Sequence, residues 1–317
     1  MNMKVGSFLK LVEIQTKVAS VIPFLIGSTY AVYHFNGFNV KNFFLMFFSL
    51  IAFDMATTAI NNYLDYKKAN KTYGYGYESH NAIVRDKLKE SDVLITIFGL
   101  LLIASLSGIV LFLNTSIIVL LLGMVSFLVG ILYTFGPVPI SRMPLGEIFS
   151  GFFMGFVIIF LSIYIHVYNS DLAGILLEQS SLLININIKE LILIFLVALP
   201  AVVGIANIML ANNICDIEDD IENKRYTLPI YIGKDKALKL FRALYYIAYV
   251  DIAILALLKI TPVFALLILL TLIPVNKNIK AFMSKQTKKD TFVTAVQNFV
   301  FMNIPMALFL GIGILIR

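Results

Sequence analysis

Long apolar segments separated by short polar ones recur along the whole chain, and they constrain its fold more than any other feature. Nine segments can be read, most of them as long as a helix that crosses a bilayer. They cover residues 18–35, 42–64, 93–113, 115–134, 146–166, 190–211, 241–258, 262–275 and 294–316. Of the 317 residues, 59% are hydrophobic and only 14% are charged, which excludes a water-soluble globular fold. The sequence therefore predicts an all-α, polytopic membrane protein, although the eighth segment is short for a full span.

Basic residues are distributed unevenly between these segments. If the N-terminus is cytoplasmic, all but four of the 25 Lys and Arg residues fall on the cytoplasmic side. The four on the outside are Lys41, Lys189, Lys259 and Arg317. Because cytoplasmic loops of membrane proteins are rich in Lys and Arg, we expect a cell-membrane protein whose long segments 66–92 and 217–240 face the cytoplasm. The net charge of +6 then reflects membrane topology, and no nucleic-acid partner is expected.

An internal repeat carries the chemistry. The motif Asn-Asn-x-x-Asp occurs at residues 61–65 and again at residues 212–216, 151 residues later. Each copy lies at the predicted cytoplasmic end of an even-numbered helix and precedes a long loop. This placement indicates two homologous four-helix halves, followed by a last helix, around a central cavity to which each half contributes one motif.

Acidic residues cluster at and after the second motif. Asp216 and Asp220 are four residues apart, so a continuous helix would place their carboxylates side by side, which is unfavourable. A divalent cation would remove this repulsion, and carboxylate and amide oxygens suit Mg²⁺, which also binds phosphate oxygens. We therefore predict a Mg²⁺ site shared by the two motifs, with Asp65, Asp216 and Asp220 as catalytic residues. The predicted metal ligands are Asn61, Asp65, Asn212, Asp216 and Asp220.

Basic residues follow both motifs or lie on the loop between the predicted fourth and fifth helices. Together with the acidic residues and the metal, they make a site suited to a pyrophosphate group, whose charge Lys and Arg side chains offset. The predicted diphosphate-binding residues are Lys67, Lys68, Arg85, Arg142, Lys224 and Arg225.

Asp54 lies about ten residues into the second predicted helix, on the same face as Asn61 and Asp65. Carboxylates inside a membrane are functional by default, so we place Asp54 with the catalytic residues, where it would position an acceptor or its proton. A structural role, as a protonated or amide-paired side chain, fits its position equally well.

At these residues the sequence resembles the UbiA superfamily of membrane prenyltransferases, and most closely its branch that prenylates 1,4-dihydroxy-2-naphthoate in menaquinone synthesis. Residues 212–228 match the second motif of that branch almost position by position. Residues 133–139 and 144–147 are similar to its loop between helices four and five, and residues 61–65 resemble its first motif. The resemblance covers nearly the whole chain and implies one prenyltransferase domain over residues 1–317. The branch usually has Asp at the position of Asn62 and Arg at that of Cys215.

The resemblance implies Mg²⁺-dependent transfer of a polyprenyl group from an allylic polyprenyl diphosphate to 1,4-dihydroxy-2-naphthoate. CO₂ and diphosphate would be lost and demethylmenaquinone formed, with the prenyl tail in a groove open to membrane lipid. Two alternatives stay open: another acceptor (4-hydroxybenzoate, haem or a lipid) on the same fold, or a cation-coupled transporter. Transporters usually place their site near the bilayer midplane, whereas these acidic residues lie at one membrane end. Prenyl chain length and oligomeric state are not determined by the sequence.

Overall fold

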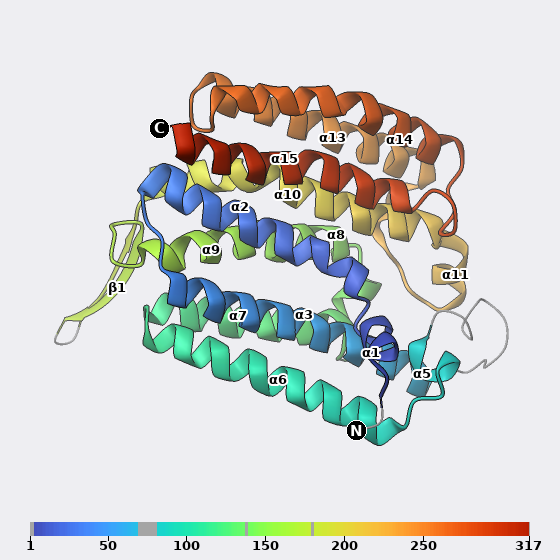
Figure 1. Cartoon of the computed structure of the whole chain (residues 1–317). Coiled ribbons are helices and arrows are strands. Elements are labelled where there is room, and N and C mark those ends of the chain that lie inside the picture. The colour runs from blue at the N-terminus through green and yellow to red at the C-terminus, as the bar shows by residue number, and fades with distance from the viewer. Residues whose placement is uncertain (1–2, 69–80, 137–138, 179–180, 317) are drawn as a thin grey trace.

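The computed structural model describes residues 3–68, 81–136, 139–178 and 181–316, and these form a bundle of long, nearly aligned helices (Figure 1). Among the described residues, eight helices are long and apolar enough to cross a membrane, and α7 is a shorter apolar helix. Together they confirm the nine predicted segments and the membrane fold. In chain order the spans are η1–α2 (Ile14–Lys17, Val18–Phe35), α3 (Val40–Lys68), α6 (Glu90–Leu113), α7 (Ile117–Thr134), α8–η3–α9 (Gly146–Ser150, Gly151–Val157, Ile158–Val167), α10 (Ile188–Cys215), α13 (Lys234–Leu257), η4–α14 (Val263–Thr271, Leu272–Ser284) and α15 (Val293–Ile316).

Short elements lie at the two ends of this bundle. At the end where α3 and α10 finish, Figure 1 shows α1, α5 and α11 together on the right. The β-hairpin projects from the opposite end. The remaining bounds are α1 (Val5–Leu11), α5 (Ala82–Arg85), η2 (Ile140–Arg142), β1 (Ala173–Glu178), β2 (Ser181–Ile186), α11 (Ile217–Glu222) and α12 (Leu228–Ile232).

The helix packing supports the two predicted halves. In the first half α3 packs along α6, and in the second α10 packs along α13 in the same order. The first helices of the halves, α2 and α9, contact each other, while α15 packs against both α2 and α10. Small residues permit these close approaches. A Cβ at Gly27 would lie 2.6 Å from the backbone oxygen of Ile159, and one at Gly155 would lie 2.6 Å from Cα of Val202.

Several helices extend beyond their apolar segments. The eighth span runs over 263–284 rather than 262–275, so it is long enough to cross a bilayer. Likewise α10 continues to Cys215, and segment 217–240 contains α11, α12 and the start of α13. An apolar pattern marks only the part of a helix that lies within the membrane, whereas the helical hydrogen bonds of the backbone continue into the polar residues beyond it. Of the other long segment, residues 69–80 lie outside the described residues.

Segment 167–189 differs from the all-helical expectation. Strands β1 and β2 pair antiparallel, with Ala173 opposite Ile186 and Glu178 opposite Ser181. The six residues of β2 are exposed. A search for long apolar segments does not detect such a hairpin, because it depends on local backbone pairing rather than on a span of apolar residues.

Candidate active site

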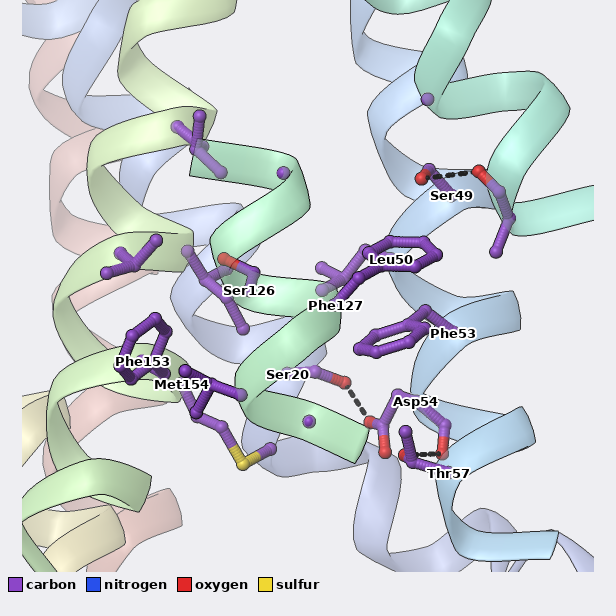
Figure 2. A pocket seen from close by; sticks show the side chains of 18 of the residues that line it. Ser20, Ser49, Leu50, Phe53, Asp54, Thr57, Ser126, Phe127, Phe153 and Met154 are labelled. Atoms are coloured by element: carbon purple, nitrogen blue, oxygen red, sulfur yellow. Dashed lines mark hydrogen bonds between the residues drawn. The ribbon is translucent and has the colours of Figure 1, made fainter. Parts of the chain in front are cut away.

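An elongated cavity of about 680 Å³ lies between α3, α6 and α7 of the first half and α8–η3–α9 of the second. Figure 2 shows its wall, with Phe53 on α3 facing Phe127 on α7 and Phe153 on the opposite helix. The Phe53 and Phe127 rings stack with their centroids 3.9 Å apart. On α3 the lining extends from Met46 to Asn61, which is about 22 Å at about 1.5 Å per residue. A chamber of this shape suits a long apolar chain.

One end of the cavity is polar. Asp54, Thr57, Thr58 and Asn61 of α3 all line it, which confirms that Asp54 and Asn61 share one helix face. Asp65 follows Asn61 by about one turn, near the end of α3, and is exposed. The first motif therefore stands at the polar end of an otherwise apolar chamber, on the side of the bundle where α10 also finishes (Figure 1).

Asp54 is held by a buried lysine. Lys17 Nζ lies 2.6 Å from Asp54 Oδ1 and 2.7 Å from Thr58 Oγ1, and Ser20 Oγ donates a 2.5 Å hydrogen bond to Asp54 Oδ2 (Figure 2). Lys17 is only 3% exposed. The structure thus pairs Asp54 with a lysine and a serine rather than with an amide. The sequence analysis counted Lys17 only among the basic residues of the predicted cytoplasmic side and did not predict this pair.

The second motif bends where α10 meets α11. Asp216 has φ −103° and ψ 9°, so the helix does not continue unbroken from Asn212 to Asp220. Asp216 Oδ2 lies 2.6 Å from Lys288 Nζ, which comes from the segment between α14 and α15. Asp220 is buried, with Arg225 Nε 3.2 Å from its Oδ1 and Thr227 Oγ1 donating to its Oδ2 at 3.1 Å.

Two basic side chains therefore offset the acidic pair that the sequence analysis assigned to a metal. Lys288 compensates Asp216, and Arg225 compensates Asp220. Burial raises the pKa of Asp220 above its ordinary value, while the Arg225 guanidinium opposes that shift. The repulsion between the two carboxylates is thus no longer an argument for a metal, and the case for Mg²⁺ rests on the type of donor and on the comparisons below.

The predicted diphosphate-binding residues are only partly brought together. Lys67 Nζ lies 2.6 Å from Glu90, and Arg85 Nε lies 2.8 Å from Asp86, so both pair with local acids. Arg225 pairs with Asp220, as described above. Arg142 and Lys224 are exposed, and Lys68 is the last residue of α3. The backbone oxygen of Arg142 accepts a 3.1 Å hydrogen bond from the Tyr226 amide, which joins the loop before α8 to the segment after the second motif.

The second Asn of each motif anchors a neighbouring segment. Asn62 Nδ2 donates to the backbone oxygen of Leu11 at 2.9 Å and so ties α1 to α3. Asn213 Nδ2 donates at 2.8 Å to Oε1 of Glu147, a buried residue of α8, while Asn212 donates to Asn213 at 3.5 Å. Sequence reasoning assigned no role to Glu147, although it closes the loop stretch that carried the resemblance.

The donor set fits Mg²⁺ only if other ligands complete it. Within the described ranges, no three His, Cys, Asp or Glu side chains gather as a metal-binding group. The motifs do offer carboxylate and amide oxygens, the hard donors that Mg²⁺ prefers. Mg²⁺ is usually bound by one or two carboxylates, several waters and substrate phosphates rather than by an all-protein cage. The arrangement therefore suits a metal that arrives with a diphosphate.

Comparison with known proteins identifies the family. The profile of the UbiA prenyltransferase family matches residues 20–304. The chain belongs to the UbiA prenyltransferase family. It is therefore a prenyltransferase and a multi-pass membrane protein. This UbiA chain is 28% identical, over 310 residues, to the 1,4-dihydroxy-2-naphthoate octaprenyltransferase of Bacillus subtilis (strain 168), covering 97% of this chain and 91% of the relative.

Solved UbiA structures share the fold. The apo UbiA homologue from Aeropyrum pernix K1 superposes with a TM-score of 0.67 at 16% identity, covering 96% of this chain and 98% of that one. The UbiA homologue from Archaeoglobus fulgidus bound to GPP and Mg²⁺ has a TM-score of 0.60 at 13% identity, covering 97% and 98%. At these identities the likeness concerns the fold alone.

Proposed function

We propose that this UbiA protein transfers a polyprenyl group from an allylic polyprenyl diphosphate to 1,4-dihydroxy-2-naphthoate, with loss of CO₂ and diphosphate, and forms demethylmenaquinone. The main supporting observation is a long apolar cavity with one polar end, which adjoins the first of the two repeated acidic motifs. Such a chamber matches a substrate with a long apolar tail and one charged head. The similarity to the Bacillus subtilis octaprenyltransferase over nearly the full length supports this choice of acceptor.

The diphosphate head would bind between the two motifs. Asn61 and Asp65 from α3, with Asn212, Asp216 and Asp220 from the second motif, would hold Mg²⁺. The homologue of the same fold that binds GPP together with Mg²⁺ supports Mg²⁺ as the metal. When bound, the metal would stabilise the charge that develops on the leaving diphosphate. Lys67, Lys68, Arg85, Arg142, Lys224 and Arg225 would offset the remaining negative charge.

The apolar wall would protect the allylic cation left after ionisation. Phe53, Phe127 and Phe153 line the cavity beyond the polar end, where they exclude water. Aromatic faces also attract a cation that lies within about 6 Å of the ring centroid. Asp54, held beside Lys17 and Ser20 at the polar end, would help to position the acceptor ring.

The proposal also covers the orientation of the protein in the membrane and the extent of its domain. One prenyltransferase domain would span residues 1–317, with the polar end of the cavity facing the cytoplasm from the cell membrane, as the distribution of Lys and Arg favours. The family assignment argues against a cation-coupled transporter. The following test distinguishes dihydroxynaphthoate from other acceptors, such as 4-hydroxybenzoate.

The decisive experiment uses purified protein in lipid nanodiscs with Mg²⁺, carboxyl-labelled 1,4-dihydroxy-2-naphthoate and a series of allylic diphosphates. We expect labelled CO₂ to be released in step with the prenylated product. A prenylated product that retains its carboxylate would contradict the proposed acceptor chemistry and leave the family assignment intact. Turnover of 4-hydroxybenzoate in preference to dihydroxynaphthoate would contradict the choice of acceptor.

A further inference from the structure

Two polar atoms beside the polar end of the cavity make no hydrogen bond of good geometry in the described part of the chain, and the Ser150 side chain is the neighbour within reach of the first of them. They are the hydroxyl of Tyr133, near the end of α7, and Oε2 of Glu147, at the start of α8. Both atoms are buried, and the Glu147 residue is only 5% exposed. Buried polar groups in proteins are almost always hydrogen-bonded, so an unpaired one requires an explanation. A bound ligand that supplies the missing partner is one such explanation.

The two atoms belong to one local cluster. A Cβ at Gly146, the residue before Glu147, would lie 3.4 Å from the Tyr133 hydroxyl oxygen, so α7 and α8 are in close contact at this point. Tyr133 lines the cavity, as does Ser150, one turn after Glu147. The cluster therefore borders the same chamber as Asp54, on a wall formed by α7 and α8.

Glu147 is held in place from the second motif. Asn213 Nδ2 donates to Glu147 Oε1 at 2.8 Å, which leaves Oε2 as the unsatisfied oxygen. Asn213 is three residues before Asp216, one of the proposed ligands of the metal that would hold the diphosphate. The same helix end would thus fix both the diphosphate site and the orientation of Glu147.

We propose that Tyr133 and Glu147 form the subsite that recognises a ring hydroxyl of the aromatic acceptor. The Tyr133 hydroxyl donates to Glu147 Oε2 when the acceptor is bound, and its oxygen accepts a hydrogen bond from the acceptor hydroxyl. Tyr133 is the binding residue and Glu147 is a positioning residue that acts through it. The subsite selects hydroxylated aromatic rings, and this inference rests on the proposed function.

The test measures acceptor affinity without turnover. Labelled 1,4-dihydroxy-2-naphthoate and its analogue without ring hydroxyls, 2-naphthoate, are bound to nanodisc protein in the presence of Mg²⁺ and inorganic diphosphate. We expect Tyr133→Phe to weaken dihydroxynaphthoate binding about tenfold, the effect of one lost hydrogen bond, and to leave 2-naphthoate binding unchanged. Glu147→Gln keeps the Asn213 contact and replaces the acceptor atom by a donor, so it should act in the same direction. The KM for the allylic diphosphate should not change in either variant.

Two control variants separate recognition from packing. Tyr245→Phe removes another buried hydroxyl, which lies on α13 beside the side chains of Asn207 and Asn298 and outside the cavity lining. Ser126→Ala removes one that lines the same cavity about two turns deeper on α7. Neither should alter acceptor binding. Equal effects of Tyr133→Phe on both naphthoates, or no effect on either, would overturn the subsite, and an effect at Ser126 alone would place the ring deeper.

The inference fails separately from the proposed function. If wild-type protein binds and prenylates a different hydroxylated aromatic compound, the variants are measured with that compound and its deoxy analogue. If the proposed acceptor is wrong, the wild-type protein uses a different compound. If the subsite is wrong, Tyr133→Phe changes the affinities for the hydroxylated compound and its deoxy analogue equally or not at all.

Discussion

Lys288, between α14 and α15, forms an ion pair with Asp216 at the end of the second motif, with Nζ and Oδ2 2.6 Å apart. The side chain of Lys288 is 52% exposed and that of Asp216 only 15%. The contact brings a basic residue from near the C-terminal end of the chain to the proposed diphosphate site. The sequence analysis counts Lys288 only among the 21 basic residues of the predicted cytoplasmic side, because nothing local distinguishes it from the neighbouring lysines.

Removing this lysine should affect substrate binding more than stability. We expect Lys288→Ala to raise the KM for the allylic diphosphate about tenfold, because a positive charge beside the diphosphate is lost. The unfolding temperature should hardly change, since half-exposed ion pairs contribute little to stability. Lys285→Ala is the matched control, because Lys285 pairs with the exposed Asp290 instead. Equal KM values in the two variants would argue against a role for Lys288.

The motif acids should be essential for turnover. Asp65→Ala and Asp216→Ala should each lower kcat by orders of magnitude while the protein stays folded, since each removes a proposed ligand of the metal at the leaving group. Glu218→Ala, an exposed acid of α11, is the control and should keep near-normal activity. Near-normal turnover of Asp216→Ala across a range of Mg²⁺ concentrations would refute the shared site.

The Lys17–Asp54 pair should behave as a buried ion pair. Replacing only Lys17 by Met leaves the Asp54 carboxylate buried without its counter-charge, which costs about 3–5 kcal/mol. We expect a double variant, Lys17→Met with Asp54→Leu, to be more stable than Lys17→Met alone. Thermal unfolding in detergent measures both. The single variant Asp54→Leu is measured as well. If the loss of unfolding free energy in the double variant is at least the sum of the losses in the two single variants, the two charges do not interact.

Gly123 should control the length of prenyl chain that the cavity accepts. It lines the cavity on α7, and a Cβ added there would meet no heavy atom within 4 Å, so a larger side chain would fill the chamber. Gly123→Phe should retain turnover with short allylic diphosphates and lose it with long ones. Gly99→Phe on α6 is the control, because its Cβ is equally unobstructed but Gly99 does not line the cavity. The chain-length profile of each variant is the measurement.

Membrane orientation is testable by cysteine labelling. In a background with Cys215 replaced by Ser, Asp235→Cys should react with an impermeant thiol reagent only from the cytoplasmic side. Asp171→Cys, near the hairpin at the opposite end, should react only from outside. Both residues are exposed. Labelling of Asp235→Cys from outside in intact cells would reverse the orientation.

The sequence alone determined the spans, the repeat and the residues of the two motifs. These features are local: a helix that crosses lipid needs about 20 apolar residues, and a motif is a short string of neighbours. The helical period was also sufficient to place Asp54 and Asn61 on one face of α3, which the cavity lining confirms. The hairpin of residues 173–186 was missed because its strands are short and pair only with each other.

The tertiary structure decided which charges pair and what faces the cavity. Lys17 reaches Asp54 across 37 residues, Asn213 reaches Glu147 across 66, and Lys288 meets Asp216 from a different helix pair. No periodicity within one helix predicts these contacts, because each depends on how a helix or loop packs against another element that is distant in the sequence. Inside the membrane a charged group needs a partner, and the packing of the helices determines which of the available side chains comes within reach.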